Sequence, residues 1–262
     1  MTPADIVLDS KRLEAARWGP SSDRAPTLVL LHEGLGCVAL WRDVPERLAA
    51  ATGFGVFAYS RFGYGQSDPT PLPRPMTYMH DEALKILPRV LDAAGIQRAI
   101  LIGHSDGGSI AAIYAGAVPD PRIAGIVLIA AHFFVEDLNI ASIEQIRTEY
   151  RTGDLRARLS RYHADTDVAF RGWNDAWLDP RFRAFDITNY LPTITVPILA
   201  LQGADDPYGT DEQLHVLARH VTAPPRTKLI QGARHSPHLE AKDATLDAVV
   251  AFVRHILPES RA

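Results

Sequence analysis

Residues 98–115 have the sequence Arg98-Ala99-Ile100-Leu101-Ile102-Gly103-His104-Ser105-Asp106-Gly107-Gly108-Ser109-Ile110-Ala111-Ala112-Ile113-Tyr114-Ala115. An apolar run predicts a strand, and the small residues after Gly108 predict a helix. Between them, Gly-x-Ser-x-Gly in a strand–turn–helix context is typical of a nucleophile elbow. Glycines suit the positions on either side of Ser105, because larger side chains would collide with the neighbouring strand and helix. Ser105 is therefore the candidate nucleophile.

Similar apolar runs recur along the chain and alternate with helical patterns. They are nearly continuous in apolar residues, as expected of strands buried on both faces of a parallel sheet. Such runs occupy residues 27–32, 55–59, 98–103, 126–130, 196–201 and 227–230, and a weaker pair is expected between residues 6 and 18. Helices are expected over 83–94, where Pro88 should kink or restart the helix, and over 246–257. This alternation predicts an α/β fold with a mostly parallel sheet.

The region from residue 134 to residue 190 interrupts this alternation. It contains no strand pattern, is rich in Arg, Asp and aromatic residues, and includes Trp173 and Trp177. Three helices are expected, near residues 141–151, 154–163 and 166–178. Because strand patterns resume afterwards, we expect residues 1–133 and 191–262 to form one core and residues 134–190 to form a helical cap inserted into it.

Composition limits the functional classes. The 262 residues include 27 Lys and Arg against 31 Asp and Glu, a formal net charge of −4, and 47% are hydrophobic. This mild acidity argues against nucleic acid or an anionic membrane as the partner. No basic leader or long apolar segment is evident, and the single Cys37 fits a reducing compartment. We expect a cytoplasmic monomer or homodimer that needs no cofactor or metal and whose partners are a small acyl substrate and water.

A serine hydroxyl needs a histidine base, and that histidine needs a carboxylate to orient it. In hydrolases with this elbow the order along the chain is Ser, then Asp or Glu, then His. The run 198–202 leads into Gly203-Ala204-Asp205-Asp206-Pro207, where Asp206 is preferred and Asp205 is the alternative. The run 228–230 leads into His235, with His238 as the alternative base. A metal site at His235-x-x-His238 lacks the glutamate or cysteines that would support it.

The tetrahedral intermediate requires two hydrogen-bond donors for its oxyanion. One is expected to be the backbone N–H of Asp106, directly after the nucleophile. The other is expected in the loop His32-Glu33-Gly34-Leu35-Gly36-Cys37, at Gly34 or alternatively at Leu35. Cys37 itself is expected to be a small buried apolar residue rather than a reactive thiol.

These motifs together resemble the α/β-hydrolase superfamily over nearly the whole chain. The resemblance is carried by Leu30–Gly34, Ser60–Ser67, Gly103–Gly108, Gly203–Asp206 and Gly232–His235. It implies an eight-stranded, mostly parallel sheet with a helical cap over the site, and it implies the same triad. One departure is Glu33, since members usually carry glycine directly after the loop histidine. Related haloalkane dehalogenases and epoxide hydrolases carry Asp at the elbow, so Ser105 argues against both activities.

The expected reaction is hydrolysis of a small or medium carboxylic ester through an acyl-enzyme. The alternatives are hydrolysis of a carbon–carbon bond in a vinylogous diketone by the same triad, or a low-turnover ligand receptor. Ser105-Asp106-Gly107-Gly108 also resembles the elbow of valacyclovir hydrolase, which implies an amino ester bound by Asp106; the alternative is an aspartate held by local backbone or by an arginine. The expected substrate pocket is lined at the loop and by residues before and within the insertion: Glu33, Leu35, His132, Phe133, Phe134, Trp173 and Trp177.

Overall fold

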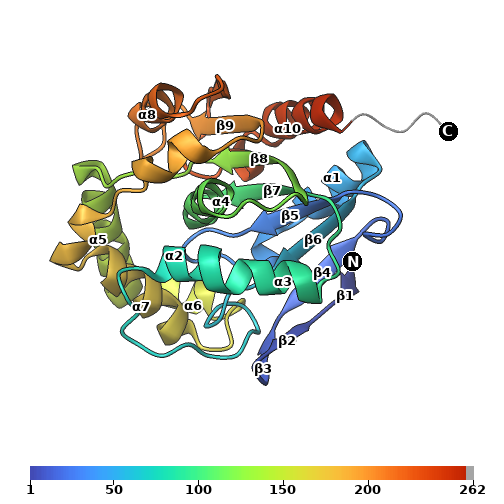
Figure 1. Ribbon diagram of the computed structural model, residues 1–262. Helices are drawn as coiled ribbons and strands as arrows, with labels where there is room; N and C mark the ends of the chain where they lie inside the picture. The colour runs from blue at the N-terminus through green and yellow to red at the C-terminus, as the bar shows by residue number, and fades with distance from the viewer. Residues whose placement is uncertain (258–262) are drawn as a thin grey trace.

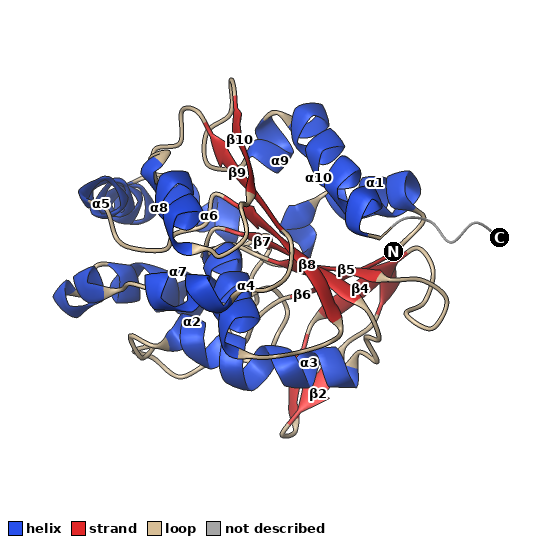
Figure 2. Cartoon of the chain, turned by 45° about the horizontal axis from the view of Figure 1, so that its top comes forward, coloured by secondary structure: helices blue, strands red, loops and turns tan. Residues whose placement is uncertain are grey.

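The computed structural model describes residues 1–257. An eight-stranded sheet runs through its centre, with helices on both faces (Figures 1 and 2). The strands lie side by side in the order β1 (Thr2–Pro3), β4 (Ala15–Trp18), β6 (Gly55–Tyr59), β5 (Thr27–Leu31), β7 (Ala99–His104), β8 (Ile123–Ile129), β9 (Ile198–Gly203) and β10 (Arg226–Ile230). The predicted eight-stranded sheet flanked by helices is confirmed.

Six strands of the sheet, from β6 to β10 in this order, are mutually parallel. Each contains or overlaps one of the apolar runs that predict strands in the sequence. At one edge of the sheet, β4 pairs antiparallel with β6, and β1 pairs antiparallel with β4. β2 (Ile6–Leu8) and β3 (Lys11–Leu13) form a separate hairpin. Because the carboxyl ends of parallel strands meet at one edge, the loops after β5, β7, β9 and β10 are brought together there.

Alternate residues of the central strands face two separate cores. In β5, Leu28 and Leu30 pack on one face, while Val29 and Leu31 pack on the other. The first face is covered by α1 (Val44–Thr52), α9 (Pro237–Glu240) and α10 (Lys242–Ile256). The second is covered by α2 (Tyr78–Asp81), α3 (Leu87–Ala93), α4 (Asp106–Ala117) and α8 (Glu212–His220). Burial on both sides explains why these strands are continuously apolar.

The predicted effect of Pro88 is confirmed, and the helix is longer than its periodicity suggests. It begins at Tyr78 and passes through a π-helical turn over Glu82–Ile86 before α3 starts at Leu87. Proline has no N–H to donate to the preceding turn, so the α-helical hydrogen-bond ladder cannot run through it unbroken. Pro88 instead lies in the first turn of α3, where a missing donor costs little.

The insertion between β8 and β9 is helical, as predicted. It comprises α5 (Asp137–Thr152), α6 (Leu155–Leu159) and α7 (Thr166–Trp177), followed by 3₁₀ turns over Pro180–Ala184 and Thr188–Thr193. Its only strand-like feature among the described residues is one bridge between Phe134 and Asp186. Figure 1 shows α5, α6 and α7 together at one side of the sheet.

None of the helices within residues 1–257 combines the length and the apolar character required to cross a bilayer.

Candidate active site

The elbow places Ser105 on a strained turn between β7 and α4. Ser105 has φ 53° and ψ −118°, in the left-handed half of backbone space that non-glycine residues seldom adopt. A Cβ at Gly103 would overlap with the backbone of Gly107, and a Cβ at Gly107 would overlap with the carbonyl of Leu31. Both glycines are therefore required by close backbone approach, as the motif predicts.

Asp206 and His235 meet from two later loops. Asp206 follows β9 and His235 follows β10, and the two Asp206 oxygens lie 2.9 and 3.0 Å from His235 Nδ1. Asp206 also accepts from the Gln202 side-chain amide at 2.6 Å and from the Tyr208 backbone N–H at 2.8 Å. Burial is the largest single influence and would raise the pKa of Asp206, but the hydrogen bond and charge of His235, the Tyr208 N–H and the nearby His132 together outweigh it, and the pKa is lowered. The carboxylate is thus ionised and holds the Nδ1 side of the ring.

The two alternatives from the sequence lie elsewhere. Asp205 is exposed to solvent, whereas Asp206 is buried. His238 is buried against Trp41 and His104, with ring centroids 5.1 and 4.6 Å away. The hydrogen bonds of the Asp206 carboxylate within residues 1–257 go to His235, Gln202 and Tyr208, and His238 is not among these partners. Asp206 and His235 are therefore the pair that the geometry favours.

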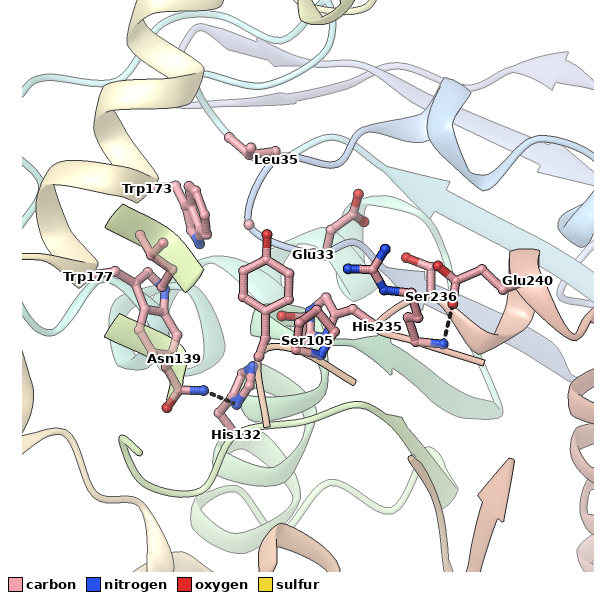
Figure 3. Close-up of a pocket in the computed structure, with 15 residues that line it drawn as sticks. Glu33, Leu35, Ser105, His132, Asn139, Trp173, Trp177, His235, Ser236 and Glu240 are labelled. Carbon is pink, nitrogen blue, oxygen red and sulfur yellow. Dashed lines mark hydrogen bonds between the residues drawn. The ribbon is translucent and has the colours of Figure 1, made fainter. Parts of the chain in front are cut away.

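Ser105 and His235 line one cavity of about 330 Å³ at the carboxyl edge of the sheet. Figure 3 draws both side chains in the lining of this cavity, together with Trp173 and Trp177 of α7. The wall that faces the sheet comes from the loops after β5, β8, β9 and β10, and the opposite wall comes from α5 and α7.

Five of the seven predicted pocket residues line this cavity: Glu33, Leu35, His132, Trp173 and Trp177. The prediction for Phe133 and Phe134 was wrong. Phe133 is 1% exposed within the core, and its N–H donates to the Gln213 side chain at 2.8 Å. Phe134 packs against the same core and forms the bridge to Asp186. Their aromatic character serves the attachment of the insertion rather than the cavity.

The loop after β5 is held in place by His32 and Arg61. His32 Nδ1 lies 2.7 Å from the Glu33 carbonyl oxygen, and His32 Nε2 accepts from the Arg61 backbone N–H at 3.0 Å. The Arg61 guanidinium donates to the carbonyls of His32 and Glu33 at 2.6 and 3.0 Å. These bonds fix the backbone that carries Gly34. A Cβ at Gly34 would overlap with the Trp173 indole, so the helical wall rests directly on this glycine.

Asp106 opens α4, so its backbone N–H has no partner inside the helix and is free for a ligand beside Ser105. Its side chain points elsewhere. The fully buried carboxylate accepts from Tyr78 Oη at 2.7 Å and from Trp177 Nε1 at 3.3 Å, and lies 3.7 Å from the Arg61 guanidinium. The Asp106 carboxylate is not among the residues that line the cavity, and its position near Arg61 agrees with the alternative that the fold itself holds this carboxylate. It joins the elbow to α2 and to the insertion.

Glu33 brings a carboxylate to the cavity. Its Oε2 lies 3.5 Å from Nδ1 of His104, and His104 Nε2 lies 2.7 Å from the carbonyl oxygen of His235. Burial would raise the pKa of Glu33, but His104 and His32 lower it well below its usual range. The departure from glycine at position 33 therefore places an ionised group at the cavity and links the β5 loop to the His235 loop.

Several cavity residues are not among the pocket residues that the sequence predicts. They are Asn139 and Ile143 of α5, Pro207 and Tyr208 after Asp206, and Arg234, Ser236 and Glu240 around His235. Pro207, Tyr208, Arg234 and Ser236 adjoin the predicted acid and base in sequence, so their proximity could have been inferred. Asn139 and Ile143 are four residues apart on one helix face, but nothing in the sequence indicates which face of α5 meets the site.

Cys37 and possible metal ligands are the remaining groups to consider for the site. Cys37 is 1% exposed, and burial raises the pKa of its thiol to about 12. It is a small apolar residue, as expected. Within residues 1–257, no group of three or more His, Cys, Asp or Glu side chains is arranged to hold a metal ion.

Comparison with known proteins places the chain in a family. The profile of the family described as "alpha/beta hydrolase fold" matches residues 26–162, more than half of the chain. Epoxide hydrolase B of Mycobacterium tuberculosis is 33% identical over 122 residues, which cover 47% of this chain but only 33% of that protein. A bifunctional esterase/perhydrolase of Acinetobacter calcoaceticus is 25% identical over 221 residues, covering 72% of this chain and 76% of that protein.

Solved structures agree on the fold. The 2-hydroxy-6-oxo-6-phenylhexa-2,4-dienoate hydrolase of Rhodococcus sp. strain RHA1 superimposes with a TM-score of 0.80, over 96% of this chain and 98% of that one. The two sequences are 18% identical, so the likeness concerns the fold alone.

Proposed function

The chain belongs to the α/β-hydrolase fold family, and we propose that it is a serine hydrolase that cleaves small or medium carboxylic esters. The observation that carries this proposal is the placement of Ser105 and His235 on one cavity, with Asp206 hydrogen-bonded to the far nitrogen of His235. A serine on a strained turn that shares a cavity with an imidazole whose Nδ1 is held by a carboxylate supports nucleophilic catalysis.

In the proposed mechanism, Asp206 holds the proton of His235 on Nδ1, which leaves Nε2 free to accept the proton of Ser105. The Ser105 oxygen attacks the carbonyl carbon and forms a tetrahedral intermediate. Its oxyanion accepts hydrogen bonds from the backbone N–H groups of Gly34 and Asp106. The intermediate collapses, the alcohol leaves with the proton from His235, and a water molecule activated by His235 then hydrolyses the acyl-enzyme.

The cavity supports a limit on substrate size. A volume of about 330 Å³ is at the small end of ligand pockets, and its outer wall contains Trp173, Trp177 and Ile143. We assign residues 134–190 as a cap over a core of residues 1–133 and 191–262, because this segment supplies that wall. The cytoplasmic location and the monomeric or homodimeric state that the sequence suggests stay predictions.

Relatives in this family act on several bond types, and the presence of serine at position 105 argues against some of these activities. By the resemblance at the elbow, epoxide hydrolases carry Asp as the nucleophile at the position that Ser105 occupies in this chain. The partial match to an epoxide hydrolase therefore does not extend to that activity. The match to an esterase/perhydrolase covers most of both chains and supports the ester proposal. Cleavage of a carbon–carbon bond would use the same three residues and is tested beside it.

The experiment compares wild type with Ser105→Ala on p-nitrophenyl esters with acyl chains of two to eight carbons. We expect wild type to hydrolyse the shorter esters and the variant to lose more than 10³-fold in kcat, while its melting temperature stays unchanged. Full activity of Ser105→Ala would refute the proposal. Rapid turnover of a vinylogous diketone with negligible ester turnover would instead favour carbon–carbon hydrolysis.

A further inference from the structure

His132 is held rigidly at the cavity beside the proposed triad. It follows β8, and its backbone is bound to the helix that starts at the nucleophile. Ser109 Oγ donates to the His132 carbonyl at 2.6 Å and accepts from the His132 N–H at 3.2 Å. Because Ser109 is one turn beyond Ser105 on α4, the position of His132 is fixed relative to the nucleophile.

Asn139 determines which nitrogen of His132 carries the proton. The Asn139 Oδ1 accepts from the Glu136 backbone N–H at 2.5 Å in the capping box of α5, so the amide nitrogen is the atom that faces His132. That nitrogen lies 3.4 Å from His132 Nδ1, which must act as the acceptor (Figure 3). In the neutral ring the proton is therefore on Nε2.

The ring is neutral and its Nε2 is available. Burial, and then the neighbouring His235, lower the pKa of His132 to about 3. The ring lies between Trp177 and His235, with centroids 5.4 and 5.7 Å away, and is nearly parallel to the His235 ring. Nε2 makes no hydrogen bond within residues 1–257, and it is absent from the fully buried polar atoms that lack a partner. An N–H donor thus faces the cavity.

We propose that Nε2–H of His132 binds an uncharged oxygen acceptor on the acyl part of the substrate, so that the enzyme prefers oxo-acyl esters to plain alkyl esters. This inference rests on the proposed ester hydrolysis. A ketone, ether or amide oxygen fits better than a carboxylate, because Glu33 and Glu240 bring two carboxylates to the cavity against one guanidinium, that of Arg234. The remaining wall, including Trp173 and Ile143, offers apolar contact for the chain.

The test measures kcat/KM for two pairs of p-nitrophenyl esters: 4-oxopentanoate against pentanoate, and 5-oxohexanoate against hexanoate. Wild type is expected to prefer the oxo ester of at least one pair by about tenfold, the effect of one hydrogen bond to a buried donor. His132→Phe keeps a ring but has no donor, and we expect its preference to fall to about one. His132→Gln keeps an N–H group near the Nε2 position and should retain part of the preference.

The ratio between the paired esters is the readout, because a general loss of structure lowers both rates together. Hydrolysis of both esters by wild type without an oxo preference, or a preference that persists in His132→Phe, would overturn the role of His132 while leaving the serine hydrolase proposal intact. If wild type hydrolyses none of the four esters and a fluorophosphonate does not label Ser105, the proposed function fails, and this inference fails with it.

Discussion

The sheet side and the helical side of the cavity are built by different means. On the sheet side, backbone geometry sets the site. Ser105 lies on a strained turn, and a side chain at Gly103 or Gly107 would overlap with neighbouring backbone atoms. On the helical side, single side chains from α5 and α7 fill the wall, and they are supported by packing against one another. Few residue types satisfy the backbone geometry of the sheet side. Most residues of the helical side, in contrast, can be substituted one at a time without disturbing the turn at Ser105.

This difference separates chemistry from selectivity. In the proposed mechanism, a change to Ser105, Asp206, His235 or the loop that carries Gly34 should lower the rate for every substrate, because these groups act on the reacting carbonyl. His132 is the sheet-side exception, since it is proposed to contact the acyl chain. A change in α5 or α7 should alter which substrates are accepted. The two sides meet at Gly34, which lies under Trp173, and at Asp106, which receives the Trp177 N–H. Changes at these contacts test whether the separation holds.

The largest effect is expected at Asp206, the acid of the proposed triad. Asp206→Asn should lower kcat by about 10⁴-fold for all esters, because an amide holds the wrong tautomer of His235. Steady-state kinetics on two esters of different chain length would show equal losses. The matched control is Asp205→Asn, the exposed neighbour, which should stay within threefold of wild type. A loss confined to one ester, or equal losses in the two variants, would contradict the assignment.

A smaller effect is expected at the contact between the two sides. Gly34→Ala should lower kcat by about 10²-fold, because the new methyl group overlaps with the Trp173 indole and displaces the loop that carries a proposed oxyanion donor. Gly34 has no left-handed backbone that would itself penalise alanine. Gly34→Ala combined with Trp173→Ala should therefore recover at least tenfold over Gly34→Ala alone. Additive losses in the double variant would place the damage in the loop rather than in this contact.

The smallest effect concerns stability against pH. Burial holds the pKa of His238 well below its usual value, so the folded state keeps this ring neutral. The unfolded chain binds a proton near pH 6.5, and stability from this group is therefore present above that pH and lost as the pH falls below it, by about 1.4 kcal/mol per pH unit. We would measure the free energy of unfolding in urea at several pH values between 7 and 5. In His238→Phe this free energy should fall less steeply with decreasing pH, because up to one fewer proton is taken up on unfolding. His255→Gln, at an exposed position, should keep the wild-type slope.

The sheet side could be predicted from sequence because its chemistry demands particular residue types at particular places. Ser105 needs small neighbours, and Asp206 and His235 must follow late strands of a parallel sheet. The patterns that predict these strands arise from burial on two faces, and they agree with the observed strands to within a few residues. The choice of Asp206 over Asp205 followed from its position in the loop, and burial agrees with it.

The helical side could not be predicted to the same depth. Amphipathic periodicity indicates that α5 and α7 exist, but not which apolar residues face the cavity and which attach the insertion. Phe133 and Phe134 were assigned to the wrong one of these two roles, while Asn139 and Ile143 were missed. For Asp106 the sequence leaves two roles open, a ligand contact or a carboxylate held within the fold, and the contacts with Tyr78, Trp177 and Arg61 favour the second.

The most direct test of the account is mass spectrometry of the intact protein and its peptides after treatment with a fluorophosphonate at neutral pH. An activated serine should form one covalent adduct, located on Ser105, and the adduct should be absent from Ser105→Ala and formed much more slowly in His235→Ala. A folded wild-type protein that forms no adduct on Ser105, or labels equally fast without His235, would contradict the claim that this imidazole activates this hydroxyl.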